Sequence, residues 1–299
     1  MSEEIRRPTF FIVGAPKCAT TSLADWLAAR SDVFMAPIKE PHFFNQDGGA
    51  AGIRDLATYE KLYRKAGPQH VAVGEASAGY LSSEVAIDRA LAYAPEARLI
   101  ACLRSPLEML PSLHHQLVFN GTEPIADFER AWEAAEERRR TDWRASSGAD
   151  WRIFHYRRMG FLGAQVSRMV ARAGRERCLF VTTEALRADP QATFARVLRH
   201  IGADASEIGP LSSANRAKTA RSPLLRQAMV QAGRLKTWLG ITQSFGLVRQ
   251  IDQINSVEAA WPPLSPAMAR LLRETYAEDI ALLGEIIGED LSHWLEETT

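Results

Sequence analysis

Short apolar segments alternate with longer segments of helical periodicity along most of the chain. Four of the short segments are nearly continuous runs of aliphatic and aromatic residues, a pattern typical of parallel strands that are covered on both faces. They are Thr9–Val13, His70–Val73, Arg98–Leu103 and Cys178–Thr182. We therefore expect these four segments to form the centre of a mostly parallel sheet.

Apolar residues recur at helical spacing in the segments between these strands. The clearest cases are residues 23–27, 162–170, 194–201 and 268–283. Pro190 is suited to begin the third of these helices, and Gly174 and Gly202 are suited to end the second and the third. Alternation of strands and helices predicts an α/β fold, a three-layer sandwich around the sheet, with residues 1–299 forming a single domain.

Composition and charge narrow the possible partners. The 299 residues are 46% hydrophobic and 24% charged, and 36 Lys and Arg balance 36 Asp and Glu. A chain without net charge has no overall attraction for nucleic acid or for a membrane surface, so an anion-binding site must be local. The polar stretches 141–150 and 209–222 are long loops of the kind that often carry function.

The cysteines and the N-terminal segment bear on location. Cys18, Cys102 and Cys178 are odd in number and far apart, a pattern that predicts neither a disulfide framework nor a zinc site. The apolar run that ends at Gly14 is too short for the core of a signal peptide or for a membrane span, and no later run is long enough. We expect a cytoplasmic protein.

The segment "FFIVGAPKCATTSLADWL", Phe10–Leu27, has the pattern of a phosphate-binding loop. A strand, a tight turn at Gly14 and the start of a helix would bring several backbone N–H groups to one point, where the helix dipole also favours an anion. Lys17 adds a positive charge. Thr20, Thr21 and Ser22 can cap the helix or donate hydrogen bonds, and capping alone is the simpler alternative.

This loop departs from the pattern of nucleoside triphosphatases. Counted from Gly14, the Gly-Lys pair of G-x-x-x-x-G-K-[ST] would fall at Ala19 and Thr20. No strand-ending aspartate that would hold Mg²⁺ is evident either. A P-loop kinase or nucleotidase is therefore the weaker interpretation, and a nucleotide-binding protein without catalysis is a second alternative.

The stretch "GAPKCATTSL", followed by "KEPHFF", resembles sulfotransferases that use 3′-phosphoadenosine 5′-phosphosulfate (PAPS), and is most similar to the branch with the carbohydrate sulfotransferases. The resemblance implies a P-loop-like fold and transfer of a sulfuryl group from PAPS to an acceptor hydroxyl by in-line displacement, with the bisphosphate PAP as product and no metal. Ala19 stands where the family usually has glycine. The implied 5′-phosphosulfate contacts are Gly14, Lys17, Cys18, Ala19, Thr20, Thr21 and Ser22.

The same resemblance implies a second anion site, for the 3′-phosphate. The family has an arginine and, eight residues later, a serine, and Arg104 and Ser112 match that separation. An arginine can bind phosphate through two parallel hydrogen bonds. Family members also use basic residues of a late loop, which corresponds here to Lys218 and Arg221, although a solvated basic loop explains these two residues equally well.

Sulfuryl transfer needs a base for the acceptor and a stabilised leaving group. The resemblance implies that Lys17 serves the leaving group and that Glu40 of "KEPHFF" is the base. His42 is the rival, because imidazole, with a reference pKa near 6.5, is better matched to neutral pH than a carboxylate near 4.3.

The acceptor side is less defined. Ala76 stands where many carbohydrate members have a lysine, which speaks against a polyanionic glycan. Ser77, Tyr80 and Tyr156 are the expected acceptor contacts. A carbohydrate, a glycolipid or a small natural product all remain open as acceptors, as do transfer to nitrogen and the oligomeric state.

Overall fold

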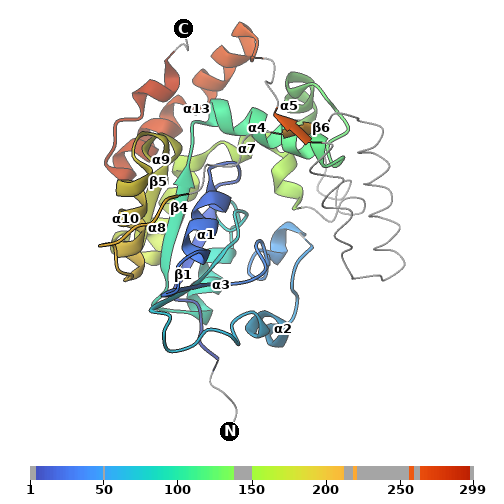
Figure 1. Cartoon of the computed structure of the whole chain (residues 1–299). Coiled ribbons are helices and arrows are strands. Elements are labelled where there is room, and N and C mark those ends of the chain that lie inside the picture. Colours follow the sequence, from blue (N-terminus) through green and yellow to red (C-terminus); the bar gives the residue numbers. More distant parts are fainter. Residues whose placement is uncertain are drawn as a thin grey trace.

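A five-stranded parallel sheet forms the centre of the molecule, in the strand order β2-β3-β1-β4-β5 (Figure 1). This computed structural model describes residues 5–49, 51–137, 150–211, 218–220, 256–258 and 263–296. The strands are β1 (Phe10–Gly14), β2 (Val33–Met35), β3 (Ala72–Ala76), β4 (Arg98–Leu103) and β5 (Cys178–Thr182). Every residue of β1 and β3 is buried, as the continuous apolar runs predict for a covered parallel sheet.

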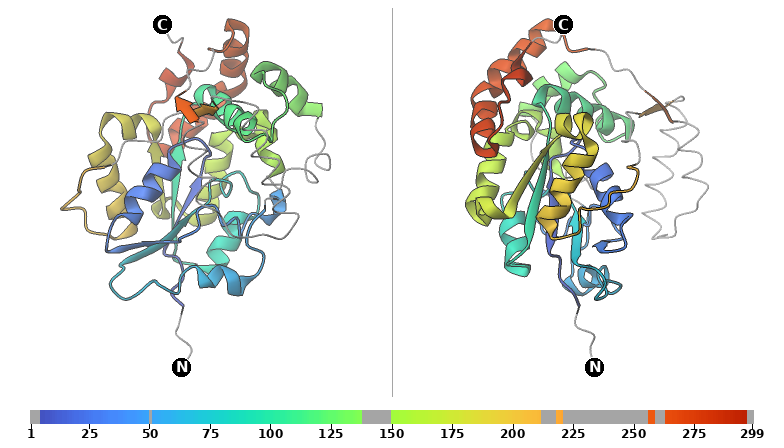
Figure 2. Two further views of the ribbon diagram at one scale, coloured as in Figure 1. Left: turned by 45° about the vertical axis from the view of Figure 1, so that its right-hand side comes forward. Right: turned by 60° about the vertical axis from the view of Figure 1, so that its left-hand side comes forward.

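Helices cover both faces of this sheet. Two of them, α1 (Thr20–Ala28) and α10 (Pro190–Ile201), share one face, where Trp26 and Phe194 meet edge to face at 5.7 Å between ring centroids. On the other face lie α3 (Ala86–Tyr93), α8 (Leu162–Ala173) and the long helix α13 (Pro266–Ile287), as the two views of Figure 2 show. The expected three-layer α/β sandwich is confirmed.

The remaining helices surround these layers. The α-helices are α2 (Leu56–Lys61), α4 (Pro106–Phe119), α5 (Phe128–Glu137), α7 (Tyr156–Met159) and α9 (Thr183–Ala188). Short 3₁₀ helices occur at Gln46–Gly48, Trp151–Phe154, Arg175–Arg177 and Ser292–Leu295. Gly174 and Gly202 end α8 and α10, and Pro190 begins α10, as the sequence predicts.

Two features of the sheet differ from the sequence pattern. Strand β2 is not among the predicted strands, because its three residues are too few to show a period. Strand β3 begins two residues later than His70–Val73 and continues through Glu75, a charged residue that interrupts the apolar run. A separate antiparallel pair joins β6 (Lys218–Ala220) to β7 (Ser256–Glu258).

The strand order determines where a site can form. Since all five strands are parallel, their carboxyl ends lie at one edge of the sheet, and β3, β1 and β4 are consecutive neighbours there. The segments that leave these three strands carry "GEASAGY", the phosphate-binding loop and Arg104. Three motifs that are far apart in the sequence thus meet at one edge.

Candidate nucleotide-binding and catalytic site

The phosphate-binding loop leaves β1 at Gly14, where only glycine fits. Its φ is +145°, and a Cβ atom there would lie 2.6 Å from the carbonyl oxygen of Ala78 and 2.9 Å from the Cβ of Leu81. The same neighbouring segment binds β1 through the Leu81 N–H, which donates to the Val13 carbonyl at 2.8 Å. Close packing against residues 78–81 therefore fixes the start of the loop.

Helix α1 begins with uncapped N–H groups pointing toward this loop. Ala19 is its N-cap residue, in a left-handed conformation (φ 64°, ψ 16°), and makes no side-chain cap. No acidic residue occupies the first turn. The hydroxyl residues Thr20 and Ser22 lie inside the helix rather than at its cap, so the capping role considered for them is wrong. An uncapped helix start is a favourable place for an anion.

The side chains of this loop divide into two kinds. Cys18 is buried and its thiol donates to the Pro16 carbonyl at 3.4 Å, so only its backbone can reach a ligand. Burial also raises the pKa of that thiol. Thr21 is half-buried, while Thr20 and Ser22 are almost completely buried. Lys17 and the backbone N–H groups are thus the strongest candidates for anion binding.

The ammonium group of Lys17 is held by a neutral acceptor. Its Nζ donates to Oε1 of Gln116, on α4, at 2.8 Å. Burial, and after it the nearby Arg104 guanidinium, lower the pKa of Lys17. A cation whose hydrogen-bond partner is uncharged keeps its attraction for a bound anion, because that partner does not neutralise it.

Arg104 lies beside Lys17 at the end of the neighbouring strand β4. Its Nη1 donates to the Lys17 carbonyl at 3.5 Å, and its Nε and Nη2 bind Oε2 of Glu108 at 2.8 and 2.7 Å. Ser112 follows Glu108 by four residues and therefore lies on the same face of α4. Arg187 of α9 approaches the same Glu108 oxygen at 3.6 Å. Basic groups from three elements meet here.

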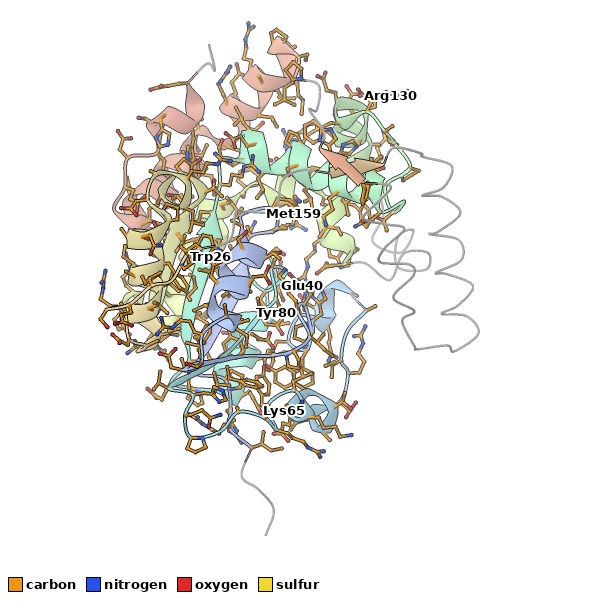
Figure 3. The ribbon with its side chains drawn as sticks, in the orientation of Figure 1. Trp26, Glu40, Lys65, Tyr80, Arg130 and Met159 are labelled. Atoms are coloured by element: carbon orange, nitrogen blue, oxygen red, sulfur yellow. The ribbon has the colours of Figure 1, made fainter. Side chains whose placement is uncertain are left out.

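Glu40 belongs to the segment that follows β2 and lies beside the end of β3, the neighbour of β1 on the side away from β4. Its backbone N–H donates to the Ala76 carbonyl at 2.9 Å, and its Oε2 accepts from the Ala78 N–H at 2.8 Å. Lys39 Nζ binds the second oxygen, Oε1, at 2.9 Å. Figure 3 shows Glu40 near the centre of the molecule, close to Tyr80. Backbone and side chain are both held, so the carboxylate has a defined position.

His42 is the second candidate base, and it contacts the first. Its Nε2 lies 3.7 Å from Oε2 of Glu40. Its Nδ1 is buried without a hydrogen-bond partner among the described residues. A Cβ atom on Gly79 would lie 3.6 Å from Cε1 of His42, so the ring packs beside that glycine. The two candidate bases thus form one pair.

Unusual backbone conformations coincide with these residues. Within the described ranges, the non-glycine residues with positive φ are Lys17 (64°), Ala19 (64°), Glu40 (57°) and His42 (51°). A left-handed conformation costs an L-residue about 1–2 kcal/mol. Such strain persists where surrounding structure enforces it, and it concentrates at ligand and catalytic sites. The backbone therefore points independently to the two segments that sequence patterns single out.

Comparisons with known proteins bear on the fold of the chain. No protein-family model matches the chain. Carbohydrate sulfotransferase 15 of Mus musculus and that of Homo sapiens are each 30% identical in a 173-residue alignment that covers 43% of this chain and 30% of the relative. The chain thus matches less than a third of the length of these relatives.

A solved structure extends the likeness to the whole fold. The crystal structure of a sulfotransferase from Alicyclobacillus acidocaldarius superposes with a TM-score of 0.73 at 24% identity, over 98% of this chain and 100% of that one.

The chain has the sulfotransferase fold.

The fold predicted from the resemblance is confirmed by this structural neighbour, and the carbohydrate sulfotransferases share part of the sequence. The comparisons do not test the individual site residues. The structure nevertheless brings Lys17, Arg104 and Glu40 to adjacent strand ends of the sulfotransferase fold.

The side chains expected to contact the acceptor are interior groups in this sulfotransferase fold. Ser77, Tyr80 and Tyr156 are each 0% exposed. Tyr156 donates to Oε2 of Glu123 at 2.7 Å, and the Tyr80 hydroxyl accepts from the Phe44 N–H at 3.4 Å. Their side chains are buried in this structure, and contact with an acceptor stays a prediction.

Several expectations lie at the edge of the described structure. Lys218 begins β6, and Arg221 lies outside the described residues, as does nearly all of the polar stretch 141–150. In the ranges that the structure describes, no cluster of three or more His, Cys, Asp or Glu suited to a metal ion occurs. Nor does any helix in those ranges have the length and apolar character needed to cross a bilayer.

Three groups in the site have no counterpart in the sequence analysis. The partner of Lys17 is Gln116, the partner of Arg104 is Glu108, and the Ala78 N–H binds Glu40. Glu108 follows Arg104 by four residues, the spacing of an ion pair on one helix face, so the sequence could have revealed this partner. No sequence signal marks Gln116, because 99 positions separate it from Lys17.

Proposed function

We propose that this protein is a sulfotransferase that moves a sulfuryl group from PAPS to an acceptor hydroxyl. One observation carries the proposal: Lys17 follows β1, Arg104 follows the neighbouring strand β4, and Glu40, from the segment after β2, is hydrogen-bonded to Ala76 at the end of β3, the other neighbour of β1. Their order across the sheet is base, sulfuryl-binding loop, second anion site. An in-line displacement needs the acceptor oxygen, the sulfur and the leaving 5′-phosphate oxygen in one line, so the base must lie beside the sulfuryl-binding loop, as this order places it.

The residues of the site fit such a donor. PAPS would supply the sulfuryl group at one anionic end and a separate phosphate at the other. The uncapped start of α1 and Lys17 are suited to the first end, and Arg104 with Ser112 to the second. Glu108 binds Nε and Nη2 of Arg104, and a phosphate would compete with this carboxylate for the same guanidinium.

The chain's own groups divide the work of transfer. Lys17 stabilises negative charge that develops on the leaving oxygen, an effect worth several kcal/mol in water-excluded sites. Glu40 accepts the acceptor proton, and His42, 3.7 Å away, is the alternative base. The carboxylate is already held by the Ala78 N–H, so it needs no large rearrangement to act.

The rival assignment as a kinase or nucleotidase is less well supported. The lysine of the loop lies three residues after Gly14 and contacts α4, and it does not occupy the position that serves β- and γ-phosphates. The likeness to sulfotransferases points the same way. A protein that binds nucleotide without catalysis would have no use for the held pair of Glu40 and His42.

For the acceptor we propose a carbohydrate hydroxyl, since the curated relatives are carbohydrate sulfotransferases. Ala76 in place of a lysine favours an acceptor of low negative charge. The three cysteines are free and buried, and we propose that the protein works in a reducing compartment such as the cytoplasm.

The test is direct. Calorimetry should show binding of PAP to the full chain without Mg²⁺, and a radiolabelled donor should transfer label to neutral oligosaccharides in preference to sulfated ones. Lys17→Ala is the inactive control. Binding of ATP that depends on Mg²⁺, together with failure to bind PAP, would overturn the assignment in favour of a kinase.

A further inference from the structure

A carboxyl group is buried in the core directly beneath the proposed base. Glu75, in β3, is 0% exposed. Its Oε2 accepts hydrogen bonds from Tyr59, on α2, at 2.7 Å and from Tyr63, in the turn that follows α2, at 3.2 Å. A fully buried glutamate is rare, and an apolar side chain would fill the space at lower cost. Its presence therefore requires an explanation other than packing.

The tyrosines around Glu75 also hold the segment that carries Glu40 and His42. The Tyr59 ring stacks on Phe43 with 4.3 Å between centroids and 10° between planes. Phe44 packs edge to face against Tyr59 at 5.2 Å and against Tyr80 at 5.8 Å. Such ring pairs favour defined offset or edge-to-face geometries. The two phenylalanines of "KEPHFF" are thus held by contacts with the rings of Tyr59 and Tyr80.

Backbone hydrogen bonds complete the connection. The Tyr80 hydroxyl accepts from the Phe44 N–H at 3.4 Å. Ala76, which directly follows Glu75, accepts from the Glu40 N–H at 2.9 Å. The Glu40 segment is therefore attached to β3 on one side and to the tyrosine cluster on the other, and Glu75 belongs to both.

We infer that Glu75 is a positioning residue for the Glu40–His42 pair, acting through Tyr59, Tyr63 and Tyr80. Its carboxyl orients the tyrosine hydroxyls, the tyrosine rings orient Phe43 and Phe44, and these hold the strained backbone at Glu40 and His42. The inference rests on the proposed function, because it assigns a role within that reaction. Glu75 itself touches no reacting atom.

The electrostatics of the cluster agree with this role. Burial raises the pKa of Glu75 to about 7, and hydrogen bonds from tyrosines 80, 59 and 63 and from Ser77 oppose the rise. Burial likewise raises the pKa values of the three tyrosines, which stay protonated as donors. The two tyrosine hydroxyls bonded to Oε2 of Glu75 are also bonded to each other, at 3.0 Å, so each restrains the orientation of the others.

The test uses substitutions that keep shape and remove single contacts. Glu75→Gln removes the acidic oxygen, and Tyr59→Phe removes one hydroxyl but keeps the stacked ring. Tyr93→Phe is the matched control, because the Tyr93 ring also packs on Tyr59 and Phe44, at 5.7 and 5.9 Å, while its hydroxyl binds Glu60 and not Glu75. For each full-length variant, kcat and KM, the Kd for PAP and the melting temperature are measured.

We expect Glu75→Gln to lower kcat about tenfold or more, the effect of losing about 1.4 kcal/mol of transition-state stabilisation, with an unchanged Kd for PAP. Tyr59→Phe should also lower kcat, but by a smaller factor. Tyr93→Phe should leave kcat unchanged. A purely structural role would lower the melting temperature and leave kcat of the folded protein intact, and that result would overturn the inference. If Glu75→Gln does not fold, the comparison of Tyr59→Phe with Tyr93→Phe decides.

The wild type separates this inference from the proposed function. If the wild-type protein neither binds PAP nor transfers a sulfuryl group, the proposed function fails and the inference with it. If the wild type transfers and the two variants of the Glu75 cluster match it, only the inference fails.

Discussion

At the scale of single residues, the most informative feature of the site is that the hydrogen-bond partner of Lys17, Gln116, carries no charge. Gln116 fixes the ammonium group by a 2.8 Å hydrogen bond and leaves its charge uncompensated. A glutamate at the same position would hold the group equally well but neutralise it. A single substitution at Gln116 can therefore distinguish the need to position the Lys17 ammonium group from the need to keep its charge available.

Gln116→Glu should raise the pKa of Lys17, weaken PAP binding and lower kcat/KM about tenfold, since a paired lysine attracts the anionic donor less. Gln116→Ala is the control, because it frees Lys17 without neutralising it and should cost less. Titration calorimetry and initial rates give both numbers. Equal losses for the two variants would mean that Gln116 serves only to place the lysine.

Glu40→Gln should lower kcat by about a hundredfold or more, the usual contribution of a general base, while the Kd for PAP stays unchanged. Binding is spared because Glu40 lies on the β3 side of the loop, and Arg104, the expected phosphate ligand, lies on the β4 side. Steady-state rates and calorimetry test both parts. Full activity of Glu40→Gln would transfer the base role to His42.

At the scale of elements, the loop after β1 depends on its neighbour from β3. A Cβ atom on Gly14 would clash with the Ala78 carbonyl at 2.6 Å, whereas a Cβ atom on Gly202 would meet nothing within 4 Å. Both glycines have positive φ. A substitution at Gly202 therefore tests the cost of the backbone conformation alone, and a substitution at Gly14 adds the cost of the steric clash.

Gly14→Ala should destabilise the protein by more than about 2 kcal/mol, as buried clashes do, and abolish PAP binding. Gly202→Ala, the matched control at the end of α10, should cost only about 1 kcal/mol and leave binding intact. Urea unfolding and calorimetry distinguish the two. Similar losses at the two glycines would show that the contact with Ala78 does not matter.

The sequence predicts elements better than it predicts contacts. The strands Arg98–Leu103 and Cys178–Thr182 have the predicted bounds, because parallel strands covered on both faces read as continuous apolar runs. The prediction that the hydroxyl residues after Ala19 cap the helix is wrong, because a capping role depends on which residue is the first of the helix. Partners such as Gln116 come from a distant helix, and no local pattern encodes them.

At the scale of the whole molecule, the buried acid in β3 links stability to pH. The pKa of Glu75 rises from 4.5 to about 7 on folding, so the folded protein holds this proton more tightly than the unfolded chain. The contribution of this proton to the free energy of unfolding is fully present below pH 4.5. It is lost as the pH rises from there through about 7.

The loss should amount to about 3 kcal/mol in the free energy of unfolding, and Glu75→Gln should not show it. Urea unfolding of both proteins between pH 4.5 and 8 gives the comparison. Parallel pH profiles for the wild type and Glu75→Gln would show that Glu75 does not titrate in this range.

The two-ended anion site is also a property of the whole molecule, since β1 and β4 each provide one end. Arg104→Ala should weaken PAP about tenfold or more, the effect of losing a charged hydrogen-bonding pair, and should hardly affect adenosine 5′-phosphosulfate, which lacks the 3′-phosphate. Calorimetry with both nucleotides measures the difference. Equal weakening of the two would show that Arg104 is not the 3′-phosphate ligand.

Strand order has a further consequence for how new specificities can arise. The groups assigned to the donor, on β1 and β4, lie on one side of Glu40, while β2 and β3 lie toward the opposite edge of the sheet. Exchange of the part of the segment after β2 that lies beyond Phe44 for that of another homologue would change the surroundings of the base, while Lys17, Arg104 and residues 78–81 stay in place. In such a chimaera, a change in acceptor preference can be measured separately from any change in donor binding.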